Sequence, residues 1–331
     1  MLKSVIKRGG VVLIGVLIVA LGRGLFFYNG FYSAPPSDTP GFEYVVVPPA
    51  PITEFSDIHE EGEGIILIDS AHDNAFNKEE LNVLLLRLVS RGSTIKFLSE
   101  EDDLKTELLG EEEEEELEEE LEEEPLDGEV VEEGTLSEEQ EVPEKPLAEE
   151  EEEEKLPPAD AFIVVCPQLE FSKDEVETVD EFLDNGGKLL LVADPTRYDS
   201  INSLSINFGL IFESDYLYNM KENENNYRNI FIAEFKENKL TEGLKKIVFY
   251  TAGSISSANS SIAFVGENTF SNVVETRSKL SPIVLAQDSK VLAIYDLTFM
   301  TEPQNGILDN NRLISNVADW LMSLAEEAKS K

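Results

Sequence analysis

The chain has one long, unbroken apolar run near its N-terminus and several shorter ones farther along. The long run, residues 9–32, contains Arg23 as its only charged residue. At roughly 1.5 Å per residue, a helix of this length crosses the hydrocarbon core of a bilayer. Its most apolar part, residues 11–21, also has the length of a secretory-signal core, with Ala20 as a weak cleavage candidate. The pattern predicts a membrane anchor over residues 1–32, and a cleaved signal is the alternative.

The basic residues around this run predict its orientation. Three of them precede it, at Lys3, Lys7 and Arg8, whereas residues 33–64 contain neither Lys nor Arg. Because the cytoplasmic flank of a membrane helix carries the excess of positive charge, we expect a single-pass cell-membrane protein with a cytoplasmic N-terminus and an extracytoplasmic main domain. Arg23 lies close enough to the outer end of the run to reach the interface.

Beyond a proline-rich stretch at 33–63, interpreted as a semi-rigid spacer, short apolar runs alternate with amphipathic ones. The expected order is strand 65–69, helix 78–91, strand 94–98, strand 161–166, helix 173–185 and strand 188–193. Capping pairs, Asn77 with Glu80 and Ser172 with Glu175, mark the two helix starts. After residue 195 the pattern weakens to short strands, until a last amphipathic helix at 310–324. The alternation predicts an α/β domain of flavodoxin-like type, with a parallel sheet covered on both faces.

One acidic segment interrupts this pattern. Residues 100–154 contain 31 Asp and Glu against two Lys, within a chain of formal net charge −42. Like charges at helical spacing oppose a helix, so we interpret 100–155 as a disordered insert in one α/β domain formed by 64–99 and 156–325. Its simplest role is that of an entropic spacer; weak divalent-cation binding, repulsion of anionic surfaces and binding of a basic partner are alternatives. So negative a chain is not expected to bind nucleic acid.

Polar residues gather where the predicted parallel strands end, which is where α/β sheets bind ligands. The candidates for a polar-ligand site are Asp69, His72, Asn74, Asp194, Arg197 and Asp296. Arg197 is suited to a bidentate anion contact, and carboxylates with an imidazole also suit a metal ion. Spacing alone identifies no metal and implies no cofactor. Each acid also has a structural interpretation, because a carboxylate after a strand can cap the next turn.

The sequence shows no activated nucleophile. Cys166 is the only cysteine, so no internal disulfide can form. It precedes Pro167 and lacks the small neighbours of a sharp strand-to-helix elbow. We therefore expect a buried thiol at this position rather than a catalytic one.

Several segments resemble the class I glutamine-amidotransferase-like domain of membrane-anchored proteins of unknown function, related to auxiliary domains of gliding-motility-type ABC transporters. The principal matches are 159–165, Phe171-Ser172 with Glu175, and 186–195; the shorter ones are Asp69-x-x-His72-x-Asn74-x-Phe76, 293–296, Asp309-Asn310, Asn316 and Trp320-Leu321. Together they cover residues 64–324 without the insert. The resemblance implies an extracytoplasmic binding or assembly module, with a transporter permease and ATPase as partners.

The resemblance also argues against glutamine hydrolysis. True amidotransferases of this class carry a Gly-x-Cys-x-Gly elbow, whereas residues 192–196 read Val-Ala-Asp-Pro-Thr, with Asp194 about where the cysteine stands. No His-x-Glu pair follows, because the only histidines are His59 and His72. We therefore predict a non-catalytic module. The alternative is a metal-dependent hydrolase or a small polar-ligand-binding protein that uses the Asp and His cluster.

Overall fold

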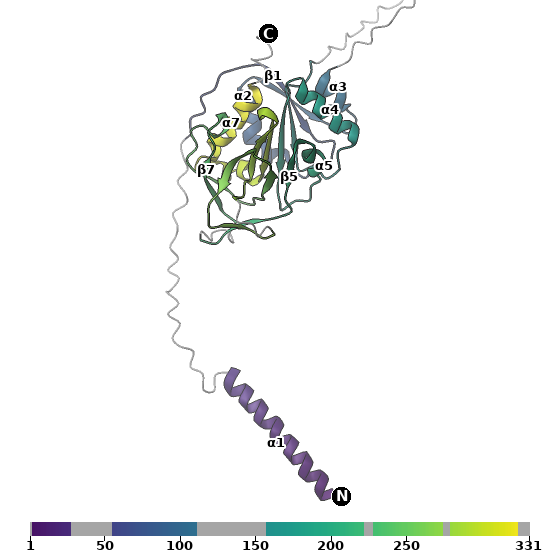
Figure 1. Ribbon diagram of the computed structural model, residues 1–331, viewed down its shortest axis with the longest axis vertical. Helices are drawn as coiled ribbons and strands as arrows, with labels where there is room; N and C mark the ends of the chain where they lie inside the picture. The colour runs from purple at the N-terminus through teal and green to yellow at the C-terminus, as the bar shows by residue number, and fades with distance from the viewer. Residues whose placement is uncertain (1, 28–54, 111–156, 222–227, 274–278, 324–331) are drawn as a thin grey trace, which may run out of the picture. The chain divides into compact units, whose positions relative to one another are not determined.

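The computed structural model describes residues 2–27, 55–110, 157–221, 228–273 and 279–323 (Figure 1). The chain divides into two compact units, 1–49 and 50–331, which are treated separately below. The predicted spacer from 33 to 54, and the predicted insert from 111 to 155, lie outside the described residues.

The described part of the first unit is the helix α1 (Leu2–Phe27). Its segment Gly9–Phe26 has a mean hydropathy of 2.2, and none of it is buried. The prediction of an N-terminal helix long and apolar enough to cross a membrane is confirmed. Signal sequences share this property.

The second unit is built on a nine-stranded sheet in the order β2-β1-β3-β4-β13-β12-β10-β7-β8. The strands are β1 (Gly64–Asp69), β2 (Ser93–Leu98), β3 (Ala161–Val165), β4 (Lys188–Ala193), β7 (Ile230–Phe235), β8 (Ile247–Phe249), β10 (Ser261–Val265), β12 (Ile283–Ala286) and β13 (Val291–Tyr295). Two small antiparallel sheets accompany it, β5 (Leu210–Phe212) with β9 (Ile255–Ser257), and β6 (Leu217–Asn219) with β11 (Thr269–Ser271).

The sheet is parallel in one half and antiparallel in the other. Strands β2, β1, β3, β4 and β13 pair in parallel, whereas every pairing from β13 to β8 is antiparallel. The α/β class is confirmed, but the expectation of a wholly parallel sheet is wrong. A parallel neighbour needs a long crossover, usually a helix. The described connections among β7, β8, β10 and β12 contain only turns, a short 3₁₀ turn and the strands β9 and β11.

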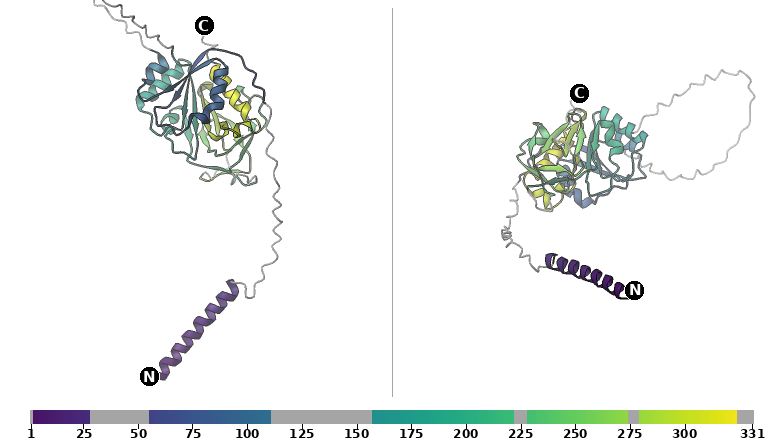
Figure 2. Two further views of the ribbon diagram at one scale, coloured as in Figure 1. Left: turned by 180° about the vertical axis from the view of Figure 1, so that it is seen from behind. Right: turned by 60° about the horizontal axis from the view of Figure 1, so that its bottom comes forward.

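Helices cover both faces of the parallel half (Figure 2). On one face α2 (Asn82–Ser90) and α7 (Asn310–Met322) pack against the alternate strand residues Ile66, Ile163 and Val192. On the other, α3 (Leu104–Leu109) and α4 (Lys173–Asp184) contribute to a second apolar cluster, with Leu67, Val164 and Leu191 from the intervening positions. Because successive side chains of a strand point to opposite faces, one apolar strand supplies both clusters.

Two predicted boundaries shift. Leu104 and Leu108 of α3 are buried, so the folded domain extends to residue 110 rather than ending at 99. At the other end, Asp57 belongs to the predicted spacer, yet it accepts hydrogen bonds from Arg87 and Arg91 of the domain. Short helical turns and single ion-paired residues leave little periodic signal, which is why the sequence pattern missed both.

The capping signal at Ser172 agrees fully with the start of α4, whereas the signal at Asn77 agrees only partly with the start of α2. Ser172 Oγ accepts from Glu175 N at 3.3 Å, while Glu175 Oε2 accepts from Ser172 N at 2.7 Å. At the earlier start, Glu80 accepts from Asn77 N at 2.8 Å, but the first turn, Lys78–Leu81, is a 3₁₀ helix that precedes α2.

Candidate functional site

Three carboxylates mark the edge where the parallel strands end. Asp69 is the last residue of β1, Asp194 follows β4 directly, and Asp296 follows β13 directly. Strands β1, β3, β4 and β13 are consecutive in the sheet, and all three acids are 0% exposed. The structure thus places the predicted acids along one edge and buries every one of them.

Asp69, His72 and Asn74 form a hydrogen-bonded group in the loop after β1. Asp69 Oδ1 lies 2.9 Å from His72 Nδ1, and Asp69 Oδ2 accepts from Asn74 Nδ2 at 3.0 Å. The same amide donates to the carbonyl oxygen of Val165 at 2.9 Å. Asp73 turns the loop with a φ of 48°, a left-handed conformation that Asp tolerates better than most residues. These bonds tie the loop to the end of β3.

The imidazole of His72 lies between two carboxylates. Its Nε2 is 3.4 Å from Glu175 Oε1 in the first turn of α4, and its ring stacks on Phe171 with a centroid distance of 3.8 Å. Burial acts to lower the pKa of His72, but Asp69 and Glu175 outweigh it and raise that pKa above the usual 6.5. The imidazolium, which donates from both nitrogens, is therefore the form that this environment favours.

Asp194 accepts hydrogen bonds from three segments of the chain. Thr196 donates to Oδ1 through its N–H at 2.9 Å and its hydroxyl at 2.6 Å. Thr251 Oγ1 donates to Oδ2 at 2.9 Å, and the Leu297 N–H and the Thr298 hydroxyl approach the same oxygen at 3.4 and 3.3 Å. Both carboxylate oxygens are thus occupied by donors of the protein.

Asp296 is enclosed by backbone donors. Oδ2 accepts from Tyr250 N at 2.5 Å and from Thr251 N at 3.2 Å, while Oδ1 accepts from Phe299 N at 3.2 Å. Burial raises the pKa of Asp296 to about 7, the charge of Asp194 adds to this, and the three N–H groups oppose it. Thr251 donates to both acids, so the structure does bring Asp194 and Asp296 together.

Arg197 makes its bidentate contact inside the chain. Its guanidinium donates to both carboxylate oxygens of Glu80, one bond being 2.9 Å, and to the carbonyl oxygen of Ala75 at 2.5 Å. Burial acts to raise the pKa of Glu80, but its bonds to Arg197 and to Asn77 N lower it overall. The fork of donors that the sequence assigned to a ligand anion is therefore held by a neighbouring side chain.

Cys166 and Asp199 lie at the same edge. Cys166 follows β3 with a φ of 43° and is 0% exposed, and burial raises the pKa of its thiol far above the usual value. The prediction of a buried thiol is confirmed. Burial likewise raises the pKa of Asp199 to about 6. Asp194, at the position that resembles the amidotransferase nucleophile, is not among the described residues with a left-handed backbone, whereas Cys166 is. Asp194 therefore lacks the strained elbow of such a nucleophile.

The edge is arranged as a set of internal hydrogen bonds rather than as a ligand cage. Within the described part of the chain, no group of three or more His, Cys, Asp and Glu side chains could hold a metal ion. The six predicted residues fall into three groups: Asp69 with His72 and Asn74, Asp194 with Asp296, and Arg197 with Glu80.

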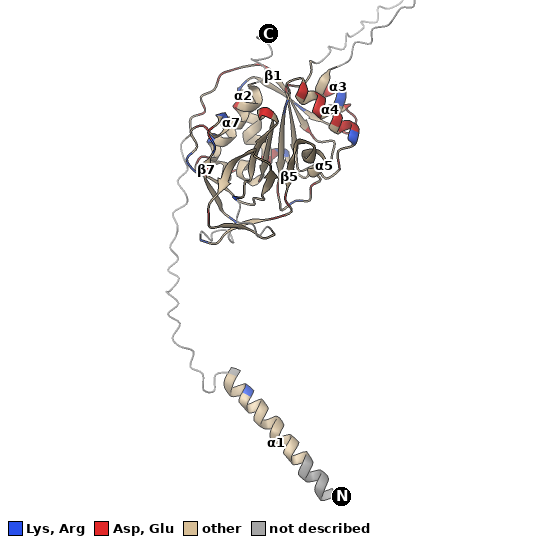
Figure 3. Cartoon of the chain, in the orientation of Figure 1, with Lys and Arg blue, Asp and Glu red and all other residues tan. Residues whose placement is uncertain are grey.

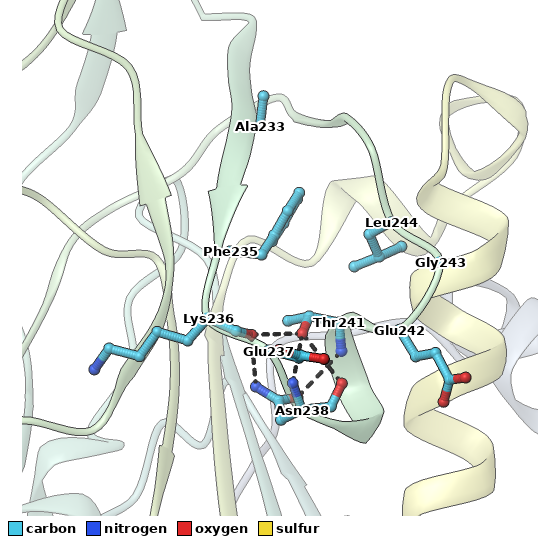
Figure 4. A pocket seen from close by; sticks show the side chains of 9 residues that line it. All are labelled: Ala233, Phe235, Lys236, Glu237, Asn238, Thr241, Glu242, Gly243 and Leu244. Atoms are coloured by element: carbon cyan, nitrogen blue, oxygen red, sulfur yellow. Dashed lines mark hydrogen bonds between the residues drawn. The ribbon is translucent and has the colours of Figure 1, made fainter.

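A separate hollow of about 590 Å³ lies between β7 and the segment that leads to β8 (Figure 4). Its lining residues are Ala233, Phe235, Lys236, Glu237, Asn238, Thr241, Glu242, Gly243 and Leu244. Asn238 and Thr241 bond to each other, each accepting from the other's backbone N–H at 3.1 Å. The rest of the lining combines apolar Phe235 and Leu244 with charged Lys236, Glu237 and Glu242, and none of the predicted site residues lines it.

Sequence reasoning missed partners that complete the strand-end groups. Glu80 and Glu175 were assigned only to helix capping, although a first-turn acid after a strand-end loop lies at this same edge. Thr251 and Thr298 follow β8 and β13 by two and three residues, and no sequence signal distinguishes them from ordinary loop threonines.

The fold and this edge define an α/β domain of mixed sheet whose polar strand ends are satisfied from within. No protein-family model matches the sequence, and no curated protein matches it. Among solved structures, the mmIFT52 N-terminal domain is similar in fold, with a TM-score of 0.54 and 14% identity over 78% of this chain and 97% of that one.

Two glycosidases superpose less well. One is α-L-fucosidase isoenzyme 2 from Paenibacillus thiaminolyticus, with a TM-score of 0.42 and 10% identity over 81% of this chain and 34% of that one. The other is exo-β-1,4-mannosidase Op5Man5 from Opitutaceae bacterium strain TAV5, with a TM-score of 0.36 and 10% identity over 80% of this chain and 36% of that one. Likeness at this level carries no conclusion about fold or activity.

Proposed function

We propose that this chain is a membrane-anchored, extracytoplasmic and non-catalytic binding or assembly module of the amidotransferase-like class, accessory to an ABC-type transporter. The observation that carries the proposal is the burial of Asp69, Asp194 and Asp296 at 0% exposure, with their oxygens engaged by donors of the chain. A general acid or base must come within hydrogen-bond reach of its substrate. These three buried acids instead hold the loops at the strand ends in place.

The sequence supports the other parts of the proposal. Helix α1 has the length and hydropathy of a membrane span, and the basic residues before it favour an extracytoplasmic domain. The transporter association rests on the resemblance of residues 64–324 to auxiliary transporter domains. Asp194, where the amidotransferase cysteine would stand, supports a module without acyl-transfer chemistry.

The test is affinity purification of the full chain from gently solubilised membranes, followed by mass spectrometry of the proteins that accompany it. Reproducible recovery of a permease and an ATPase is the expected result. The matched control exchanges residues 9–26 for an unrelated single span, and the same partners should remain if the extracytoplasmic domain makes the contact. Recovery of the chain alone in several detergents would overturn the transporter association.

A metal-dependent hydrolase or a polar-ligand-binding protein is the second candidate. The observation in its favour is the pair of raised carboxyl pKa values at one edge, about 7 for Asp296 and about 6 for Asp199. Shifted acids cluster at functional sites, although structural networks shift them as well. Stoichiometric metal in the purified chain, lost with Asp194→Asn and kept with Asp180→Asn on the exposed face of α4, would favour this candidate.

A further inference from the structure

The small sheet formed by β6 and β11 has an apolar outward face. Phe270 pairs with Tyr218 in the ladder, and their ring centroids are 5.9 Å apart. Tyr216 and Met220 flank Tyr218 at alternate positions and therefore point to the same side. The exposed fractions are 44% for Tyr216, 61% for Met220 and 46% for Phe270. Tyr216, Tyr218, Met220 and Phe270 are called the β6–β11 face below, and Val273, 61% exposed, lies two residues beyond β11.

Packing against the core of the domain does not account for the exposed apolar side chains of this face. The inward positions Leu217, Asn219 and Thr269 are buried, so the sheet already has a side that packs. A two-stranded sheet with one packed side ordinarily shows polar residues on the other. Contiguous apolar side chains on a surface mark contact with another molecule or a membrane.

Charge is distributed unequally over the domain (Figure 3). Helix α4 carries six acids against Lys173. Helix α3 contacts α4, and the sequence that follows Gly110 contains most of the chain's acidic excess. The strands β6 and β11 lie toward the end of the domain opposite α4 (Figure 1), and Lys221, Arg228 and Glu267, near these strands in sequence, are exposed. The acidic end and the apolar end are thus separated.

We propose that the β6–β11 face inserts into the interfacial region of the lipid bilayer. The proposal rests on the proposed function, because it requires an uncleaved anchor. Tyrosine and other amphipathic rings favour the depth of the lipid headgroups, and Met adapts to irregular apolar surroundings. With this face in the membrane, the acidic end is directed away from anionic headgroups.

The N-terminal anchor favours the lipid bilayer as the surface that the β6–β11 face contacts. Residues 28–54 connect α1 to the domain, and a stretch of this length reaches at most about 90 Å. A tether of this length holds the domain at high effective concentration near the surface, so a few apolar side chains suffice for contact. A membrane protein within the same reach is the competing occupant, and the experiment below separates it from lipid.

The experiment measures depth in the membrane with the full chain in phosphatidylcholine nanodiscs. A nitroxide is attached to Val273→Cys and, as the matched control, to Glu177→Cys on α4; the unsubstituted chain, whose Cys166 is buried, is the labelling blank. Electron paramagnetic resonance then compares collisions with oxygen, which enters the bilayer, and with a nickel chelate, which stays in water. We expect an oxygen-to-nickel ratio several-fold higher at 273 than at 177.

Two further arms keep the outcome decisive. The exposed substitutions Met220→Ser and Phe270→Ser, added to the Val273→Cys chain, should lower its ratio to that of the control. Equal ratios at 273 and 177 would overturn the proposal, as would shielding of 273 from both reagents, which indicates contact with protein. Failure of the full chain to remain in the nanodisc would count against the anchor and hence against the proposed function itself.

Discussion

The two halves of the sheet use their polar and apolar residues in opposite ways. In the parallel half, helices cover both faces, and the acids at the strand ends are buried under donors from neighbouring loops. In the antiparallel half, strands joined by turns leave an open hollow beside β7, and the separate β6–β11 sheet that accompanies it presents aromatic side chains to the outside. The strand-end acids of the parallel half are buried, whereas the antiparallel half and the small sheet that accompanies it leave a hollow and apolar side chains exposed.

This difference teaches that a polar cluster at strand ends is not by itself a site. The ends of parallel strands need loops that turn back over the sheet, and buried acids such as Asp69 and Asp194 supply acceptors for the N–H groups of those loops. Function is then better sought where burial is incomplete. In this chain that is the antiparallel half.

The largest predicted effect is that of Asp194→Ala. The substitution leaves the Thr196 N–H and the hydroxyl of Thr251 without their acceptor in a buried place, so the free energy of unfolding should fall by about 3–5 kcal/mol. Denaturant unfolding of the full chain in detergent measures it. Asp180→Ala on the exposed face of α4 is the control, with an expected change within about 0.5 kcal/mol. Equal effects would show that the edge acid is not structural.

The pH dependence should be the next largest effect. Asp296 keeps a proton to about pH 7 in the folded state, whereas an unfolded Asp releases it near about pH 4. Stability should therefore fall as pH rises through this window, by up to about 1.4 kcal/mol per unit. The raised pKa of His72 has the same sign, since its contribution is present below pH 6.5 and is lost as pH rises through the folded value.

Thermal unfolding between pH 5 and pH 8 measures this slope. The acidic segment also responds to pH, so the series is repeated at high salt, which screens exposed charges far more than buried ones. A transition temperature that rises with pH at high salt would contradict the assignment of protons to these two groups.

His72→Gln should have a smaller effect that sharpens the comparison. Glutamine keeps a donor but not the positive charge between Asp69 and Glu175, so a loss of about 1–3 kcal/mol is expected at pH 6. This loss should shrink as pH rises through the raised pKa of His72, because the wild-type imidazole then loses its charge. A pH-independent loss would show that ring packing on Phe171, rather than charge, is the larger contribution.

The smallest effect on stability is expected in the small β6–β11 sheet, from Phe270→Ser. The side chain is nearly half exposed and its main contact is the ring of Tyr218, so the cost should be about 0.5–1 kcal/mol. Thermal unfolding of the full chain checks this. A cost as large as that of Asp194→Ala would mean that the β6–β11 face supports the core.

Much of the parallel half could be predicted from the sequence because buried parallel strands are continuous apolar runs with capped helices between them. Residues 188–193 and the capping box at Ser172 were identifiable in this way. The antiparallel pairings were not, since three-residue strands such as β6, β8 and β11 have no measurable period. Pairings such as Arg197 with Glu80 and Asp194 with Thr251 join residues 117 and 57 positions apart, and only the tertiary structure reveals them.

The central claim, that the strand-end acids serve the fold rather than a metal or ligand, is tested most directly by thermal unfolding of the chelator-treated full chain with and without Mg²⁺, Mn²⁺, Ca²⁺ or Zn²⁺. A cation that binds only the folded state raises the transition temperature. Cations bound by the acidic segment in folded and unfolded chains alike do not. The account predicts the same transition with every cation, whereas a rise that Asp194→Asn abolishes and Asp180→Asn leaves intact would contradict it.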